Sequence, residues 1–354
     1  MQRIMIVIAV VGMLIFGTFL TPTPRTFALS SNCSARGAYV DLSGCNLSSA
    51  NLEYANLEYA NLEYANLEYA NLTDATLTSA NLSGADFTGA NLSSADLIYA
   101  NLSGANLTGA NLTGANLMYA DLTGANLTGA TLTSADLSGA NITNATLTAV
   151  ISGNIVSNYL LSSELFLPTT DWKLINGYLI GPTANLSGVN LSGVNLSGVN
   201  LTSANLANAN LANATLISAT LTGANLAGAN LTNANLTNAN LTSANLTNAD
   251  ITGSVFTNTT LTAISSGGLI GSPSRMPGGS WSIINGYWFG PYANFSGVNL
   301  TTVGGIAFNF EHTNYEGINF SGANLSNVTF DDVSLYKAYL LNTNFANATF
   351  KNNS

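Results

Sequence analysis

Apolar side chains recur at every fifth position through most of the chain. Leucine, replaced once by phenylalanine and once by isoleucine, fills 22 central positions from Leu42 to Leu147. The spacing resumes one residue out of phase for 16 positions from Leu186 to Leu261, and for 12 from Phe295 to Phe350, one of them Gly305. A small residue, usually alanine, stands two positions before each central residue, and the positions between are polar or glycine.

A period of five fits neither the 3.6-residue turn of a helix nor the two-residue repeat of a strand. It fits a backbone that turns a corner every five residues, with leucine and the preceding alanine inward and Asn, Ser, Thr and Gly at the bends. Asn and Gly tolerate the backbone angles that bends require. We therefore expect stacked coils without helix, stabilised by contacts between neighbouring coils.

The phrase Ala-(Asn/Asp)-Leu-X-X resembles the pentapeptide-repeat family from Val40 to Phe350, apart from two inserts. The resemblance implies an all-β, right-handed quadrilateral β-helix with four pentads per coil, so that residues twenty apart share a face. The chain then divides into a signal peptide or N-terminal anchor (1–28), an N-terminal cap (29–41), a first block (42–149), an insert (150–183), a second block (184–263), a second insert (264–292) and a Phe-rich third block (293–354).

The two inserts contain one module used twice. The twenty residues from Trp172 and the twenty from Trp281 agree at 14 positions. Asn176-Gly177 and Asn285-Gly286 lie between apolar residues, a strong signal for a β-hairpin. The inserts also resemble those of large secreted bacterial pentapeptide-repeat proteins. We expect each hairpin to cap one block and restart the next; the alternative is a ligand site, because aromatic residues gather at recognition surfaces. That aromatic patch would comprise Trp281, Tyr287 and Trp288.

The N-terminal residues have the features of an export signal. Arg3 precedes an apolar run from Ile4 to Leu20, and Thr26-Phe27-Ala28 forms an acceptable small-residue cleavage site. This pattern predicts a secretory signal peptide, or an uncleaved anchor as the alternative. The protein is then secreted or on the cell surface. In that oxidising location Cys33 and Cys45 predict a disulfide that pins the cap over the first coil, the alternative being two buried free thiols.

Charge and chemistry narrow the function classes. Charged residues make up only 7% of the chain, and without residues 1–28 it carries 17 acidic and 5 basic groups, a net charge of −12. A protein with this negative charge is not expected to bind nucleic acid, and it would associate with a membrane only if the N-terminal segment remains as an anchor. The sequence has one histidine, His312, so it offers neither a metal site made of several imidazoles nor a nucleophile activated by a histidine. We expect no enzyme, no metal and no cofactor.

Two outward patterns are candidate binding surfaces. Four copies of Asn-Leu-Glu-Tyr-Ala would place a belt of Glu and Tyr around one coil, and Tyr59, Tyr99 and Tyr119 would align on one face with Ser79 interrupting. The alternative is a recent duplication that leaves solvated side chains. In the second block one face carries threonine after every central leucine: Thr202, Thr222, Thr242 and Thr262. This ladder could bind a regular surface; the alternative is a face that is simply solvated.

These observations leave two functions of different class. One is a non-catalytic structural or interaction rod with an unknown extracellular or surface partner. The other is binding of ice or a crystalline polysaccharide through the threonine ladder. Some members of the family mimic DNA and bind gyrase, but the sparse, scattered acidic residues and the leader argue against that role here. Only four residues follow Phe350, too few for a capping helix, so we also expect self-association through the C-terminal coils.

Overall fold

The computed structural model describes residues 33–157, 165–278, 281–303, 306–307, 309–311 and 315–352. The export signal predicted in residues 1–28 and His312 lie outside these ranges. All regular elements in them are strands, β1 to β9. No helix that could span a bilayer occurs in this part of the chain.

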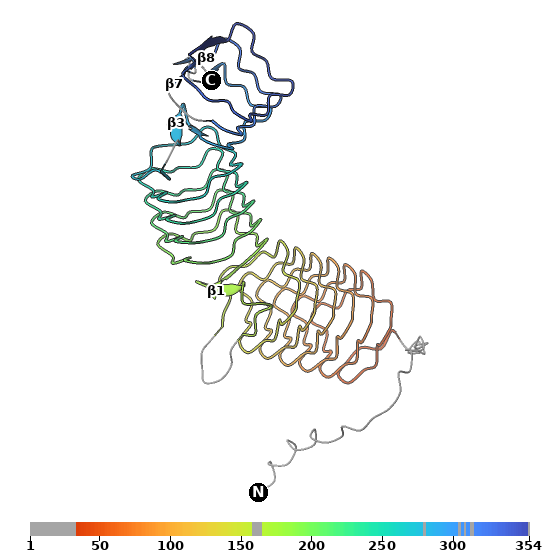
Figure 1. The fold of residues 1–354 in the computed structure, drawn as a ribbon. Helices are drawn as coiled ribbons and strands as arrows, with labels where there is room; N and C mark the ends of the chain where they lie inside the picture. Colours follow the sequence, from red (N-terminus) through yellow and green to blue (C-terminus); the bar gives the residue numbers. More distant parts are fainter. Residues whose placement is uncertain are drawn as a thin grey trace, which may run out of the picture.

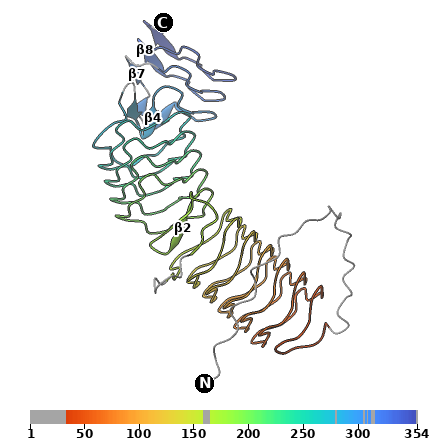
Figure 2. The same cartoon turned by 60° about the horizontal axis from the view of Figure 1, so that its bottom comes forward.

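The described chain forms a right-handed quadrilateral β-helix. Parallel bridges join residues twenty apart, such as Asn61 with Asn81 and Asn205 with Asn225, which confirms four pentads per coil. The central leucines and the preceding alanines form the core; Leu226 and Ala224, for example, are fully buried. Figures 1 and 2 show three stacks of coils joined in a row, with a change of direction near β1 and β2.

Each corner of a coil follows from the chemistry of its pentad. The carbonyl of Leu57 accepts from the amide of Ala60 at 3.0 Å, which closes a β-turn. The third residue of the turn, Tyr59, has a φ of 58°. Glycine and asparagine, which tolerate positive φ, fill many of the equivalent positions, and serine or tyrosine fills most of the others. Oδ1 of Asn56 accepts from the amide of Glu58 at 3.1 Å, an Asx turn that explains the preference for Asn or Asp before leucine.

The two predicted hairpins are confirmed. β1 (Lys173–Ile175) pairs antiparallel with β2 (Tyr178–Ile180), and β3 (Ser282–Ile284) pairs in the same way with β4 (Tyr287–Phe289). Both residues of each two-residue loop have positive φ: Asn176 50° and Gly177 76°, Asn285 48° and Gly286 77°. This is the twist that a two-residue hairpin loop needs.

Each hairpin closes one stack of coils and begins the next. Successive residues of a strand point to opposite faces. In β4, Trp288 packs on Phe256 of the second block with ring centroids 5.2 Å apart, whereas Phe289 stacks on Phe295 of the third block at 4.3 Å. In β2 the equivalent neighbours, Leu179 and Ile180, are both fully buried.

A buried serine anchors each hairpin. Ser152 and Ser266 occupy central positions where the pentads end, and both are buried. The Ser152 hydroxyl accepts from the amide of Leu179 at 3.0 Å, and the Ser266 hydroxyl accepts from the amide of Trp288 at 2.9 Å. The repeated module therefore extends back into the ends of the blocks, where the sequence Thr-Leu-Thr-Ala occurs at 146–149 and again at 260–263.

One ladder of bridges passes through both inserts. Among the described residues, the other three ladders of the first block end at Thr146, Val156 and Phe166. The shared face thus keeps the three blocks in register. Its bridged residues are Asn51, Asn71, Asn91, Asn111, Thr131, Ile151, Asn185, Asn205, Asn225, Asn245, Ser265, Asn294, Asn319 and Tyr339.

The third block departs from a regular repeat at its start. β5 (Thr302–Val303) and β6 (Ile306–Ala307) form an antiparallel pair around the predicted central residue Gly305, itself outside the described residues. Bridges there span 25 residues, as from Asn294 to Asn319. The sequence count of every fifth residue was therefore wrong at Gly305, because the β5–β6 pair adds five residues to this coil and is not a pentad of it. Three parallel strands follow on one face: β7 (Asn309–Glu311), β8 (Thr329–Asp331) and β9 (Thr349–Lys351).

Candidate interaction surfaces

The outward polar side chains bond mainly to each other along the rod. On the shared face of the second block, the amide nitrogen of each asparagine donates to Oδ1 of the asparagine one coil earlier: Asn205 to Asn185 at 3.2 Å, Asn225 to Asn205 at 3.1 Å and Asn245 to Asn225 at 3.2 Å. These polar groups form flat ladders instead of converging on one point. In the described part of the chain, no group of three or more His, Cys, Asp or Glu side chains could hold a metal ion.

The predicted threonine ladder lies in register on one face of the second block, since Asn200, Thr220, Asn240 and Thr260 are bridged in turn. Its hydroxyls are not equivalent. Those of Thr202 and Thr242 each donate to the preceding asparagine at 2.7 Å. Thr222 and Thr262 follow a threonine instead of an asparagine. The hydroxyl array thus alternates in chemistry from coil to coil.

The candidate aromatic patch is part of the core at the second insert. Trp288 is fully buried, and Trp281 and Tyr287 are half-buried. The two tryptophan rings meet edge to face at 6.2 Å. The ring of Trp281 also covers Gly290, where an added Cβ would lie 2.3 Å from the ring. Trp288 therefore offers no surface to a ligand, and the cluster seals the joint between two blocks.

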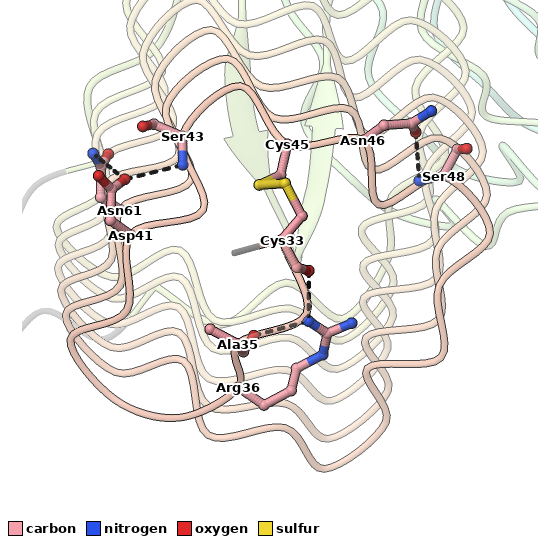
Figure 3. The surroundings of a disulfide bond; sticks show 9 residues. All are labelled: Cys33, Ala35, Arg36, Asp41, Ser43, Cys45, Asn46, Ser48 and Asn61. Carbon is pink, nitrogen blue, oxygen red and sulfur yellow. Dashed lines mark hydrogen bonds between the residues drawn. A yellow bond between two sulfur atoms is a disulfide. The ribbon is translucent and has the colours of Figure 1, made fainter. Parts of the chain in front are cut away.

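The N-terminal cap covers the open end of the first coil. Cys33 and Cys45 form a disulfide, with Cα atoms 5.6 Å apart, and Cys45 is fully buried. Figure 3 shows Cys33 reaching across the mouth of the coil to Cys45. Arg36 donates to the carbonyls of Cys33 at 3.0 Å and Ala35 at 2.8 Å, which holds the loop in place.

Stacked tyrosines follow one corner of the first block. The rings of Tyr39 and Tyr59 are 4.9 Å apart with planes at 12°, and those of Tyr99 and Tyr119 are 5.1 Å apart with planes at 9°. All four rings are exposed. Ser79 lies between the pairs. The sequence indicated the alignment of three of these tyrosines; it missed Tyr39, which lies in the cap and outside the counted repeats.

Acidic groups concentrate in the same block. Residues 37–149 contain ten Asp and Glu residues and neither Lys nor Arg. Their positions spread over all four faces, so they form no single acidic face. Some are engaged locally: hydrogen bonds from the hydroxyl and amide of Ser43 lower the pKa of Asp41. Those from the hydroxyl and amide of Thr252 likewise lower the pKa of Asp250 in the second block.

A model of the family described as pentapeptide repeats matches most of the chain in several copies, some of them overlapping, at residues 41–78, 55–93, 70–109, 110–148, 184–223, 219–258 and 309–342. The chain is a pentapeptide-repeat protein. The matched ranges leave out both inserts and the N-terminal segment. Members of this family are generally non-catalytic. No curated protein sequence matches the chain.

Solved structures of other pentapeptide-repeat proteins resemble the chain. HetL of the cyanobacterium Nostoc sp. strain PCC 7120, involved in regulation of heterocyst differentiation, is 29% identical; the match covers 69% of this chain and 93% of HetL, with a TM-score of 0.33. Rfr23 of the cyanobacterium Cyanothece 51142 is 33% identical over 31% of this chain and 88% of its own, with a TM-score of 0.25. QnrB1, a plasmid-mediated fluoroquinolone resistance protein, is 18% identical; the match covers 62% of this chain and 83% of QnrB1, with a TM-score of 0.28. Because these superpositions score so low, the family assignment depends on the sequence match.

Proposed function

We propose that this pentapeptide-repeat protein is a non-catalytic rod that binds a partner protein outside the cytoplasm. The observation that carries the proposal is the different chemistry of its blocks. The first block bears ten carboxylates and exposed tyrosines, whereas residues 184–263 contain no tyrosine and a single charged residue, Asp250. Exposed tyrosines are typical of protein interfaces. A rod whose only task was spacing would not need such a difference.

The location outside the cytoplasm is supported by two features. The apolar run after Arg3 has the length of a signal peptide, and disulfides such as Cys33–Cys45 persist mainly in oxidising compartments. The test is expression of the full chain in a secreting host. We expect export, an N-terminus near Leu29 by mass spectrometry, and no reactive thiol before or after unfolding. Cytoplasmic accumulation with two free thiols would contradict this location.

Partner binding is tested by capture from cell-surface and culture extracts with the mature protein. Tyr99→Ser and Tyr119→Ser together should reduce capture. Thr202→Ser and Thr222→Ser, a matched pair of outward changes in the second block, should leave it unchanged. Equal capture by both double variants would reject the first block as the binding region, and the absence of any captured protein would reject the interaction role.

A second candidate is binding of a regular surface, ice or a crystalline polysaccharide, by the threonine face. Its support is the register of Thr202, Thr222, Thr242 and Thr262 at one coil rise, about 4.8 Å. Replacing Thr222 and Thr262 by lysine should abolish ice recrystallisation inhibition or retention on cellulose. Lysine at Thr237 and Thr257, on the next corner, should not. A wild-type protein inactive in both assays removes this candidate.

A further inference from the structure

The tyrosine corner of the first block lacks one ring. Tyr39 stacks on Tyr59 and Tyr99 stacks on Tyr119, each pair about one coil rise apart. Tyr59 and Tyr99 are separated by two coils, roughly 10 Å at this rise, because Ser79 occupies the coil between them. At this corner, one coil therefore lacks the ring that its neighbours carry. A planar group inserted there would contact an aromatic face on each side.

The backbone does not require a small residue at this gap. Ser79 has a φ of 57°, the same as Tyr99 at 57° and close to Tyr59 at 58°. Its amide donates to the carbonyl of Ile98 at 2.8 Å, as the amide of Tyr99 does to Met118 at 3.0 Å. The coil would therefore accept a tyrosine at position 79, and the gap comes from side-chain size alone.

Charge selects the occupant. The first block has ten carboxylates spread over its four faces and neither Lys nor Arg in residues 37–149, and Glu58 lies next to Tyr59 and Asp96 three residues before Tyr99. A neutral ring would fill the space without using this charge, and an ammonium group is not planar. A guanidinium is both planar and cationic, and it stacks well on aromatic faces.

We infer that the tyrosine corner binds an arginine-bearing segment of a cationic partner protein, with one guanidinium seated between Tyr59 and Tyr99 over Ser79. The inference rests on the proposed function, because it names the chemistry of the partner. The other rings of the corner, Tyr39 and Tyr119, support the two walls of the gap from behind by stacking.

The test compares hexa-arginine and hexa-lysine binding to the mature protein by calorimetry. Both peptides carry the same charge, so the difference between their affinities reports the contribution of the guanidinium. We expect about tenfold tighter binding of hexa-arginine, because the planar guanidinium stacks on both rings and is more weakly hydrated than the ammonium of lysine. Ser79→Tyr should complete the stack and reduce the difference to about twofold or less. Ser94→Tyr, at a corner on another face with a similar φ of 55°, should keep it.

Four outcomes overturn the inference. Equal affinity of the wild type for the two peptides removes the guanidinium preference. An unchanged preference in Ser79→Tyr, with a native circular dichroism spectrum, places the arginine elsewhere. Tighter binding of a phenylalanine-containing hexapeptide assigns the gap to a neutral ring. A partner captured from extracts equally by the wild type and Ser79→Tyr retains the interaction role while rejecting this site.

Discussion

At the scale of the residue, each position of the pentad has one physical task. The central leucine is buried, the residue before it accepts a backbone amide through Oδ1, and the second residue after it adopts positive φ. The fivefold spacing was enough to predict which side chains point inward, because burial of apolar groups dominates stability. It could not predict the asparagine ladders. Their bonds join residues twenty apart, so they depend on the coil length as much as on the pentad.

A paired substitution in the second block tests the inward and outward assignment. Leu226→Asp puts a charge into the core next to fully buried neighbours. We expect it to cost about 3 kcal/mol or more. Asn225→Asp loses only the bond donated to Asn205, about 1 kcal/mol. Urea unfolding followed by circular dichroism measures both, and equal losses would contradict the assignment.

Asp250 should make stability depend on pH. Its folded pKa is lowered mainly by the Thr252 hydroxyl, at 2.6 Å, and by the Thr252 amide, at 2.9 Å. A lowered folded pKa stabilises the fold above the unfolded pKa of about 4, and this contribution is lost as the pH falls through the folded value. Asp250→Asn should therefore flatten the fall in melting temperature below pH 4. The same fall in both proteins would contradict it.

At the scale of the element, the hairpins show where prediction from sequence succeeds and where it stops. Asn-Gly between apolar residues was sufficient for both turns. For the aromatic patch, the alternative to a cap, the sequence could not show how deeply each ring lies. Because β4 lies between two cores, Trp288 and Phe289 are both buried, whereas Trp281 and Tyr287 are half-buried. The roles of Ser152 and Ser266 were missed because a serine ending a leucine series looks like the end of the repeat. Their role as hydrogen-bond acceptors becomes visible only from the buried backbone amides that donate to them.

Ser266→Ala tests the anchor of the second hairpin. It leaves the amide of Trp288 buried without its acceptor, which should cost about 1 to 3 kcal/mol. Hydrogen exchange at Trp288 should accelerate while amides of the second block, such as that of Leu226, stay protected. Ser265→Ala, at the neighbouring outward position, is the control and should change neither. Unaltered exchange at Trp288 in Ser266→Ala would rule out the anchor.

At the scale of the whole molecule, the two ends differ. The N-terminal end is closed by the cap and its disulfide. At the C-terminal end β9 pairs with β8 alone among the described strands. Phe350, stacked on Phe330 at 4.9 Å, is 50% exposed, and Leu341 is 74% exposed. The last described coil therefore exposes apolar side chains beside the outer edge of β9.

Self-association through this end is the corresponding prediction. The mature protein should be at least dimeric at tens of micromolar by light scattering, because pairing of β9 edges would bury Phe350 and Leu341. Phe350→Asp should yield monomers, whereas Thr202→Asp, far from the end, should not. A wild-type protein that is monomeric at these concentrations would refute the prediction.

The single shared ladder sets how the molecule responds to tension. Bonds between coils lie along the rod, and a coil inside a block holds its neighbour on four faces. At the inserts the shared face contributes two backbone bonds each: Ala149 to Thr183 and Asn185 to Val150, then Ala263 to Tyr292 and Asn294 to Ile264. One hydrophobic cluster spans the first joint, but separate clusters meet between Trp288 and Phe289 at the second. Pulled from its ends, the protein should therefore yield first at the second joint, then at the first, and unwind its coils last.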